Sequence, residues 1–336
     1  MRLSSSLQQA PERALLAARV TTNSGLVLII AGPTASGKTD LAVALSREVP
    51  AEIISADSRA VYRGLDAGTA KPPRAPDGLV DGVPYHLLDR LDPREAFDAG
   101  TFARESRALC GEILNRGRLP IVAGGTGFYL SAFLHGLAPL PRGSAAIRER
   151  LLEESARRGR AWLHERLQAA DPRAAAAIPK GNIHRTIRAL EVAELSGRPI
   201  SELWEEARPE PLPCRSLLAA IRWTPAELRR RIEERSRRIW PGILAETQAL
   251  MEKGYSGAEP GFQSLGYREA VSCLRGEKTR ESGLEDLQRR TLAYAKRQRT
   301  YLRNKLSALE IEGGPIPDMT AQVLSLLRGF GAGSRE

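Results

Sequence analysis

The sequence has little of the residue types on which several classes of protein depend. Its 336 residues include three cysteines, four histidines and 5% aromatic residues. No C-x-x-C pair and no local histidine cluster occur, which argues against a disulfide framework and a zinc site. No apolar run is long enough to span a bilayer, and the apolar stretch 14–18 is too short for a secretory signal. We therefore expect a cytoplasmic protein that does not enter a membrane.

The remaining composition is that of a globular protein with an excess of positive charge. Hydrophobic residues make up 42% of the chain and charged residues 27%, which are ordinary values. The formal net charge is +10. A basic surface favours a polyanionic partner, and nucleic acid is the first candidate. However, nearly all of this charge is arginine in an alanine-rich chain, so biased genome composition is an alternative explanation.

Residues 26–49 have the pattern of a phosphate-binding loop between a strand and a helix. The apolar run 26–31 is typical of a buried parallel strand, and a helical spacing of apolar residues follows the loop. Between them lies G-x-x-x-x-G-K-T at 32–39, whose glycines let backbone N–H groups curl around an anion. Lys38 would add a mobile cation, and the Thr39 hydroxyl can ligate Mg²⁺. The loop alone does not identify the phosphate compound.

Two later strands are expected to end in polar residues at one edge of a parallel sheet. The run 52–56 ends on Asp57 and Ser58, and the run 119–123 ends on a Gly-Gly-Thr-Gly sequence that contains Thr126. Ligands of open parallel sheets bind at the carboxyl ends of the strands. Asp57 is therefore a candidate general base or Mg²⁺ ligand, although a carboxylate here can also cap the next helix. A plain glycine turn is the alternative for the second strand end.

The sequence divides into a sheet-forming core and a helical insert. Residues 142–213 are bounded by prolines and have a helical pattern rich in alanine, arginine, glutamate and leucine. We expect the core, 25–141 and 214–330, to be α/β, with a P-loop NTPase-like parallel sheet. Residues 1–24 are expected to form a flexible extension. The arginine-rich faces of the insert could face solvent or RNA.

The region after the insert contains two expected helices with many arginines. On 225–251, Arg231, Arg235 and Arg238 follow one another at helical spacing beside an apolar stripe. Guanidinium groups in such a row can clamp phosphates through paired hydrogen bonds. A second basic helix is expected at 284–306.

Taken together, the motifs resemble those of the tRNA dimethylallyltransferase family and occur in the family's order. The matching segments are 32–39 (GPTASGKT), 55–58 (SADS), 68–72 (GTAKP), 86–89 (HLLD), 124–129 (GGTGFY), 188–192 (RALEV), 231–235 (RIEER), 265–269 (LGYRE) and 295–300 (AKRQRT). Many enzymes share one phosphate-binding loop, whereas this ordered set is far more specific. The departures are small: Tyr301 stands where tryptophan is expected, and Leu265 where isoleucine or valine is usual.

The resemblance implies transfer of a dimethylallyl group from dimethylallyl diphosphate to the exocyclic amine of an adenine. That adenine lies immediately 3′ of the anticodon in tRNAs that read codons beginning with U. The implied cofactor is Mg²⁺ at Thr39, and the implied partner of a monomeric enzyme is the tRNA anticodon stem-loop. The implied catalytic residues are Asp57 as general base, Thr126 and Arg235.

The resemblance also implies two sets of binding residues. Those implied for the diphosphate are Gly32, Thr34, Ala35, Ser36, Gly37, Lys38, Thr39 and Arg235. Those implied for tRNA are Asp57, Ser58, Arg59, Ala60, Thr126, Arg148, His184, Arg185, Gln263, Gly266, Tyr267 and Arg268.

Three other functions share parts of this pattern. A phosphoryl-transferring kinase would use the same loop, but it gives no reason for Asp57, Thr126 and a basic helical insert together. A nucleotide-dependent RNA-binding module gives no reason for Asp57. An enzyme that prenylates free adenine nucleotides would not need the arginine-rich insert or the basic C-terminal helices.

Overall fold

The structure is a computed structural model that describes residues 25–332, so the predicted extension 1–24 lies outside the described residues. The chain divides into two compact units. His135–Pro211 forms one unit, and the described residues before and after it form the other. The sequence predicted an inserted unit at 142–213. In the structure this unit begins seven residues earlier and ends two residues earlier, at 135–211.

The larger unit is built on a six-stranded sheet in the order β3-β2-β4-β1-β5-β6. All five strand pairs are parallel, which confirms the predicted α/β class. The strands are β1 (Leu26–Ala31), β2 (Ala51–Ser55), β3 (Tyr85–His86), β4 (Leu119–Gly124), β5 (Arg215–Arg222) and β6 (Leu309–Glu312). Because the strands are parallel, their carboxyl ends meet at one edge.

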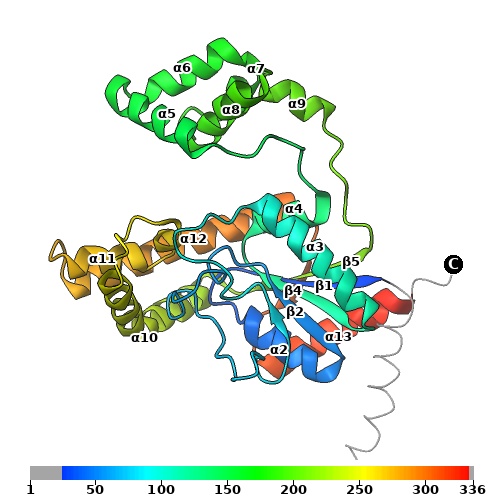
Figure 1. Cartoon of the computed structure of the whole chain (residues 1–336). Coiled ribbons are helices and arrows are strands. Elements are labelled where there is room, and N and C mark those ends of the chain that lie inside the picture. The colour runs from blue at the N-terminus through cyan, green and yellow to red at the C-terminus, as the bar shows by residue number, and fades with distance from the viewer. Residues whose placement is uncertain (1–24, 333–336) are drawn as a thin grey trace, which may run out of the picture. The chain divides into compact units, whose positions relative to one another are not determined.

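Alternate residues of β1 serve two hydrophobic cores, one on each face of the sheet. Leu28 and Ile30 belong to the core beneath α2 (Lys38–Glu48) and α13 (Ile316–Ala332), whereas Val27 and Ile29 belong to the core beneath α3 (Ala99–Asn115) and α4 (Gly127–His135). This alternation follows from the two-residue period of a strand and explains why the whole run is apolar. Figure 1 shows α2 and α13 beside the sheet.

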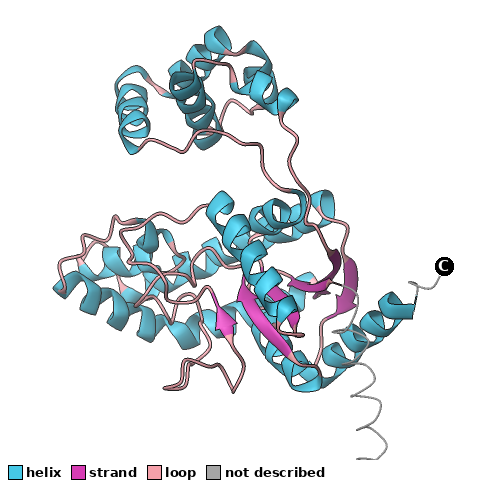
Figure 2. Cartoon of the chain, turned by 45° about the vertical axis from the view of Figure 1, so that its right-hand side comes forward, coloured by secondary structure: helices cyan, strands magenta, loops and turns pink. Residues whose placement is uncertain are grey.

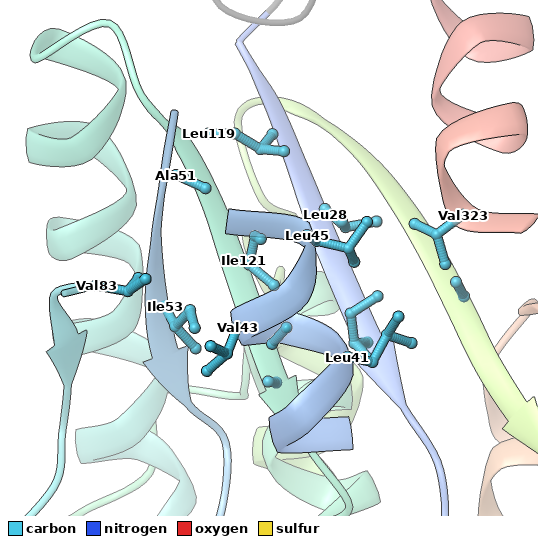
Figure 3. Packing of buried hydrophobic residues seen from close by; sticks show 14 of the residues in the cluster. Leu28, Leu41, Val43, Leu45, Ala51, Ile53, Val83, Leu119, Ile121 and Val323 are labelled. Carbon is cyan, nitrogen blue, oxygen red and sulfur yellow. The ribbon is translucent and has the colours of Figure 1, made fainter. Parts of the chain in front are cut away.

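Helix α2 is held on the sheet by one apolar stripe. Leu41 and Leu45 are fully buried and face Leu28 of β1, with Val323 of α13 beside them (Figure 3). The loop that precedes α2 is therefore fixed at both ends, by β1 on one side and by this packed helix on the other.

A third core joins the C-terminal helices to the loop that follows β2. The helices are α10 (Pro225–Glu252), a 3₁₀ turn (Pro260–Gln263), α11 (Tyr267–Leu274) and α12 (Arg280–Lys305). Tyr62 and Leu65 from the loop pack with Trp240 of α10, Tyr267 of α11 and Leu287 of α12. This core brings α10 and α12 to the edge of the sheet where the strands end.

Residues 135–211 contain only helices and loops (Figure 2). The helices are α5 (Ala145–Arg158), α6 (Arg160–Ala170), α7 (Pro172–Ala177), α8 (Ile183–Ser196) and α9 (Ile200–Glu206). They share a separate core that includes Leu151, Leu163 and Leu190. Asp171 and Asn182 cap α7 and α8, and Pro172 stands at the first position of α7. The chain leaves the larger unit at Leu134 and re-enters it at Leu212, whose N–H donates to the Leu134 carbonyl at 2.7 Å.

Within 25–332, none of the helices combines the length and the apolar character needed to cross a bilayer.

Candidate active site

The loop between β1 and α2 has the curled backbone that its glycines predict. Gly37 has φ 91° at the N-cap of α2, a conformation that favours glycine. A Cβ on Gly32 would lie 2.8 Å from Ser36 Oγ, so a side chain there would collide with the loop itself. Ala35 also has a positive φ, 64°, which is uncommon for a residue other than glycine, asparagine or aspartate.

Side chains from α10 and α12 hold this loop from outside. Arg231 Nε donates to the Ala35 carbonyl at 2.9 Å, and an Arg235 guanidinium N–H donates to Thr34 Oγ1 at 2.9 Å. The Thr34 N–H donates to the Gln298 side chain at 2.8 Å. The structure thus brings Arg235 to the loop, as the resemblance implied.

The loop forms one wall of a pocket of about 1050 Å³ that lies entirely within the larger unit. The residues after β2 and β4 form a second wall, and basic residues of α10 and α12 form a third. The lining includes Thr34, Ala35, Ser36, Gly37, Lys38, Thr39, Asp57, Ser58, Arg59, Gly125, Arg231, Arg235, Arg238, Gln263, Tyr294, Arg297 and Gln298. Gly32 and Thr126 are not among the lining residues.

The pocket contains cations that have no carboxylate partner. In the described part of the chain, neither Lys38 nor Arg235 forms an ion pair. Burial lowers the pKa of Lys38 to about 8; nearby Asp57 acts in the opposite direction, and Arg235 lowers it further. Burial likewise lowers the pKa of Arg235. Buried cations that form no ion pair favour an anionic ligand.

Two buried polar atoms of the pocket lack a hydrogen-bond partner within the described residues. They are Ser36 Oγ and Arg235 Nε. Buried polar atoms are nearly always paired in folded proteins. A bound phosphate group would supply acceptor oxygens for both, so the residues present fit such a group.

Asp57 lies at the carboxyl end of β2 and lines the pocket. Its Oδ1 accepts the Arg59 N–H at 2.8 Å, which stabilises the turn after the strand. The Ser58 N–H donates to Thr126 Oγ1 at 3.3 Å, and the Tyr294 side chain lies near Thr126. The ends of β2 and β4 are thereby joined, so the predicted catalytic residues Asp57 and Thr126 do come together.

The predicted tRNA-contacting residues of the larger unit differ in exposure. Gln263 and Arg268 are exposed. By contrast, Ala60, Gly266 and Tyr267 are buried, and their contact with tRNA stays a prediction. The Tyr267 hydroxyl donates to Glu246 at 2.5 Å and accepts the Gly68 N–H at 3.1 Å. Tyr267 therefore connects the GTAKP segment to α10 and α11.

The predicted tRNA-contacting residues of the helical unit also separate into two kinds. His184 and Arg185 are exposed at the N-terminal end of α8. Arg148 instead pairs with Glu191, a fully buried carboxylate, at 2.8 Å. Although burial alone would raise the pKa of Glu191, hydrogen bonds from Arg148 and Arg188 lower it. Arg148 thus has a structural partner as well as an exposed surface.

Thr39 is the residue predicted to bind Mg²⁺. It lines the pocket in the first turn of α2, beside the pocket carboxylates Asp40 and Asp57. Tyr85 lies near it, and burial raises the pKa of this phenol, so it stays protonated. The described residues contain no cluster of three metal-binding side chains. Mg²⁺ commonly uses one or two protein ligands together with phosphate oxygens and water, so this donor set fits.

Sequence reasoning did not assign roles to Gln298 and Trp223. Gln298 is buried and bonds the loop, and the Trp223 indole N–H donates to the Ser36 carbonyl at 3.1 Å. For Gln298 the sequence held two signals: its place in the AKRQRT motif, and an amide on the partly apolar side of the helix expected at 284–306.

The sequence matches the family described as IPP transferase over residues 60–305 and that described as isopentenyl transferase over 25–76. The tRNA dimethylallyltransferase of Elusimicrobium minutum is 40% identical over 294 residues, which cover 87% of this chain and 95% of that protein. The tRNA dimethylallyltransferase of Anaeromyxobacter sp. (strain Fw109-5) is 45% identical over 279 residues, with 83% and 92% covered.

Two solved structures resemble the fold. The full-length tRNA isopentenylpyrophosphate transferase of Bacillus halodurans has a TM-score of 0.65 and 33% identity, with 92% of this chain and 97% of that one covered. A eukaryotic dimethylallyltransferase acting on tRNA has a TM-score of 0.77 and 24% identity, with 92% and 80% covered. The second likeness concerns the fold alone.

Proposed function

The chain belongs to the tRNA dimethylallyltransferase family, whose members modify tRNA by prenyl transfer, and from this premise we propose how its pocket carries out the reaction. The donor is dimethylallyl diphosphate. The acceptor is the exocyclic amine of the adenine immediately 3′ of the anticodon, in tRNAs that read codons beginning with U. The observation that carries the proposal is a pocket in which unpaired Lys38 and Arg235 lie close to a carboxylate, Asp57.

The phosphate-binding loop holds a leaving group here. As the bond between the prenyl carbon and the diphosphate oxygen breaks, negative charge builds up on the diphosphate. Lys38, Arg235 and the backbone N–H groups at the start of α2 stabilise that charge. Mg²⁺, held at Thr39, would neutralise further charge on the diphosphate.

Asp57 acts on the acceptor. An adenine amine is a poor nucleophile because its lone pair is delocalised into the ring. As the amine nitrogen bonds to the prenyl carbon, it becomes acidic, and the Asp57 carboxylate accepts the proton. Thr126 supports this turn from the end of β4 through its contact with Ser58.

The acceptor must leave its stack to reach the pocket. Flipping a base out of the anticodon loop costs a few kcal/mol, which contacts with the RNA backbone can offset. His184 and Arg185 of the helical unit, and Gln263 and Arg268 of the larger unit, are the exposed residues proposed for these contacts. The enzyme acts as a monomer in the cytoplasm, where tRNA is found.

Incubation with labelled dimethylallyl diphosphate and either total tRNA or AMP tests this function. Label should enter tRNA, require Mg²⁺ and decrease steeply with added salt, because RNA binding releases counterions. Equal labelling of AMP, with a flat salt dependence, would instead indicate a free-nucleotide prenyltransferase. Light scattering on the purified native protein measures its molar mass in solution and tests whether it is a monomer.

A further inference from the structure

Gln298 connects its own helix, α12, with two segments that are distant in the sequence. Its side-chain oxygen accepts the Thr34 N–H at 2.8 Å, and its side-chain nitrogen donates to the Gly125 carbonyl at 2.8 Å. The side chain is only 6% exposed, so both bonds are shielded from water. One amide therefore connects the phosphate-binding loop with the end of β4.

The position requires an amide of this length. A backbone N–H and a backbone C=O must be satisfied side by side. Only asparagine and glutamine have an acceptor oxygen and a donor nitrogen on the same side-chain carbon. The partner groups also fix which end of the amide is oxygen. A Cβ on Gly125 would lie 2.3 Å from the Gln298 nitrogen, so Gly125 leaves the space that this amide occupies.

Gln298 and Lys38 bind the two ends of one peptide group, the one between Pro33 and Thr34. The Thr34 N–H and the Pro33 carbonyl belong to the same planar peptide and point in opposite directions. While Gln298 holds the N–H on one side, the carbonyl faces the other side, where it accepts the Lys38 ammonium at 2.7 Å. In the described residues this ammonium has no carboxylate partner, so the carbonyl supplies its protein contact.

We propose that Gln298 is a positioning residue that holds the Lys38 ammonium in the phosphate-binding loop, acting through the Pro33–Thr34 peptide. Without Gln298 the only other backbone hydrogen bond of this peptide among the described residues is the long one from the Ser36 N–H to the Pro33 carbonyl, at 3.3 Å. The carbonyl that aims Lys38 into the pocket is then held less firmly. The inference rests on the proposed function only in taking a diphosphate as the ligand of the loop.

The test compares two glutamines of the same helix. Gln298→Met removes both hydrogen bonds with little change in volume. Gln288→Met is the matched control, because Gln288 contacts the Glu233 carbonyl of α10 at 3.4 Å and does not line the pocket. Binding of inorganic diphosphate in the presence of Mg²⁺ is measured by calorimetry on the full chain. Gln298→Met should weaken it about 5- to 20-fold and Gln288→Met less than about twofold.

A second measurement separates positioning of Lys38 from general damage to the fold. In a Lys38→Ala background, Gln298→Met should change diphosphate binding by less than about twofold, because its target is already absent. Binding of tRNA should remain equal in the two single variants. If circular dichroism shows that Gln298→Met is unfolded, Gln298→Asn replaces it; this amide is one methylene shorter and cannot span both partners.

The outcomes distinguish this inference from the proposed function. Equal diphosphate binding by Gln298→Met and Gln288→Met would overturn the inference, and so would the same loss in the presence and absence of Lys38. Failure of the parent protein to bind diphosphate would overturn both proposals. If diphosphate binding follows the expected pattern but no tRNA is labelled, the inference stands and the proposed acceptor is wrong.

Discussion

The two arginine-rich regions of the molecule use their charges differently. In the helical unit, buried Glu191 forms ion pairs with Arg148 and Arg188, with N···O distances of 2.8 and 2.5 Å. Glu194 forms an ion pair with Arg166 at 2.8 Å. Around the pocket, Lys38 and Arg235 have no such carboxylate partners among the described residues. The number of basic residues therefore does not distinguish the two regions, whereas the pairing of these cations does.

This difference has a thermodynamic meaning. A paired charge contributes to the stability of the fold, although an exposed pair contributes little. A buried cation without a carboxylate lowers stability and remains available to an anion. The helical unit should thus respond to loss of its arginines mainly in stability, and the pocket mainly in binding and rate.

The largest effect is expected at the carboxylate beside these unpaired cations. Asp57→Asn keeps the shape of the side chain but cannot accept a proton, so the rate of transfer should decrease about 10²- to 10⁴-fold. Binding of each substrate should change much less, because the proton moves only as the transition state forms. Single-turnover transfer at saturating tRNA measures this. A rate within a few-fold of the parent would make Asp57 structural, and loss of diphosphate binding would assign it to Mg²⁺.

The next effect is expected at Lys38. Lys38→Ala should weaken binding of dimethylallyl diphosphate about 10- to 100-fold, from the loss of a charged hydrogen bond worth about 1.5–3 kcal/mol. The free energy of unfolding should stay equal or increase, because a buried cation without a carboxylate is removed. Calorimetry and thermal unfolding give the two numbers. A variant that bound normally and unfolded more easily would reverse the comparison between the two regions.

The pH dependence of binding is a smaller effect with a defined sign. The pKa of Lys38 is lowered to about 8, so the side chain is protonated below that pH and attracts diphosphate fully. Above pH 8 the advantage of the parent over Lys38→Ala should decrease, by at most about tenfold per pH unit. The unliganded protein should show the opposite trend. Between pH 8 and 10.5, the ordinary pKa of lysine, Lys38 is protonated in the unfolded chain and deprotonated in the folded protein. The free energy of unfolding of the parent, relative to that of Lys38→Ala, should therefore increase with pH in this range.

The smallest binding effect is expected in the helical unit, and it separates two neighbouring arginines. Arg185→Gln should weaken tRNA binding a few-fold, lower the salt slope by about 1 and leave stability unchanged. Arg188→Gln should lower the free energy of unfolding by about 1–3 kcal/mol, because Glu191 and the Pro141 carbonyl lose a donor. Filter binding and thermal unfolding are the measurements. Equal effects of both variants on tRNA binding would show that pairing does not decide the role of these arginines.

Local patterns made the sheet and the loop predictable. The glycines at 32 and 37 and the apolar runs before and after them determine backbone conformation over a few residues, so the strand–loop–helix unit and the α/β class could be read directly. The helical row of arginines and the family resemblance both pointed to Arg235, which the structure brings to Thr34. Strand β6 was missed because it is short and mostly exposed.

Exposure and long-range contacts could not be read from the same patterns. The bond from Thr34 to Gln298 spans 264 residues, and no local spacing encodes it. Tyr267 lies in a motif that was assigned to tRNA binding, but whether its ring faces solvent depends on the core shared by α10, α11 and α12. The pairing of Arg188 with Glu191 could be suspected from their spacing on one helix, but the burial of Glu191 could not.

The hydrogen bond between Leu212 and Leu134 bears on the order in which the chain assembles. Strand β5 pairs directly with β1, although the helical unit separates the two in sequence. Closing a long flexible loop carries an entropy penalty that grows with its length. A unit with its own core and mostly local contacts forms quickly. Once residues 135–211 have folded, their two ends lie close together and the loop that separates β5 from β1 is effectively shorter. Early folding of the insert would therefore lower the entropy cost of pairing β5 with β1.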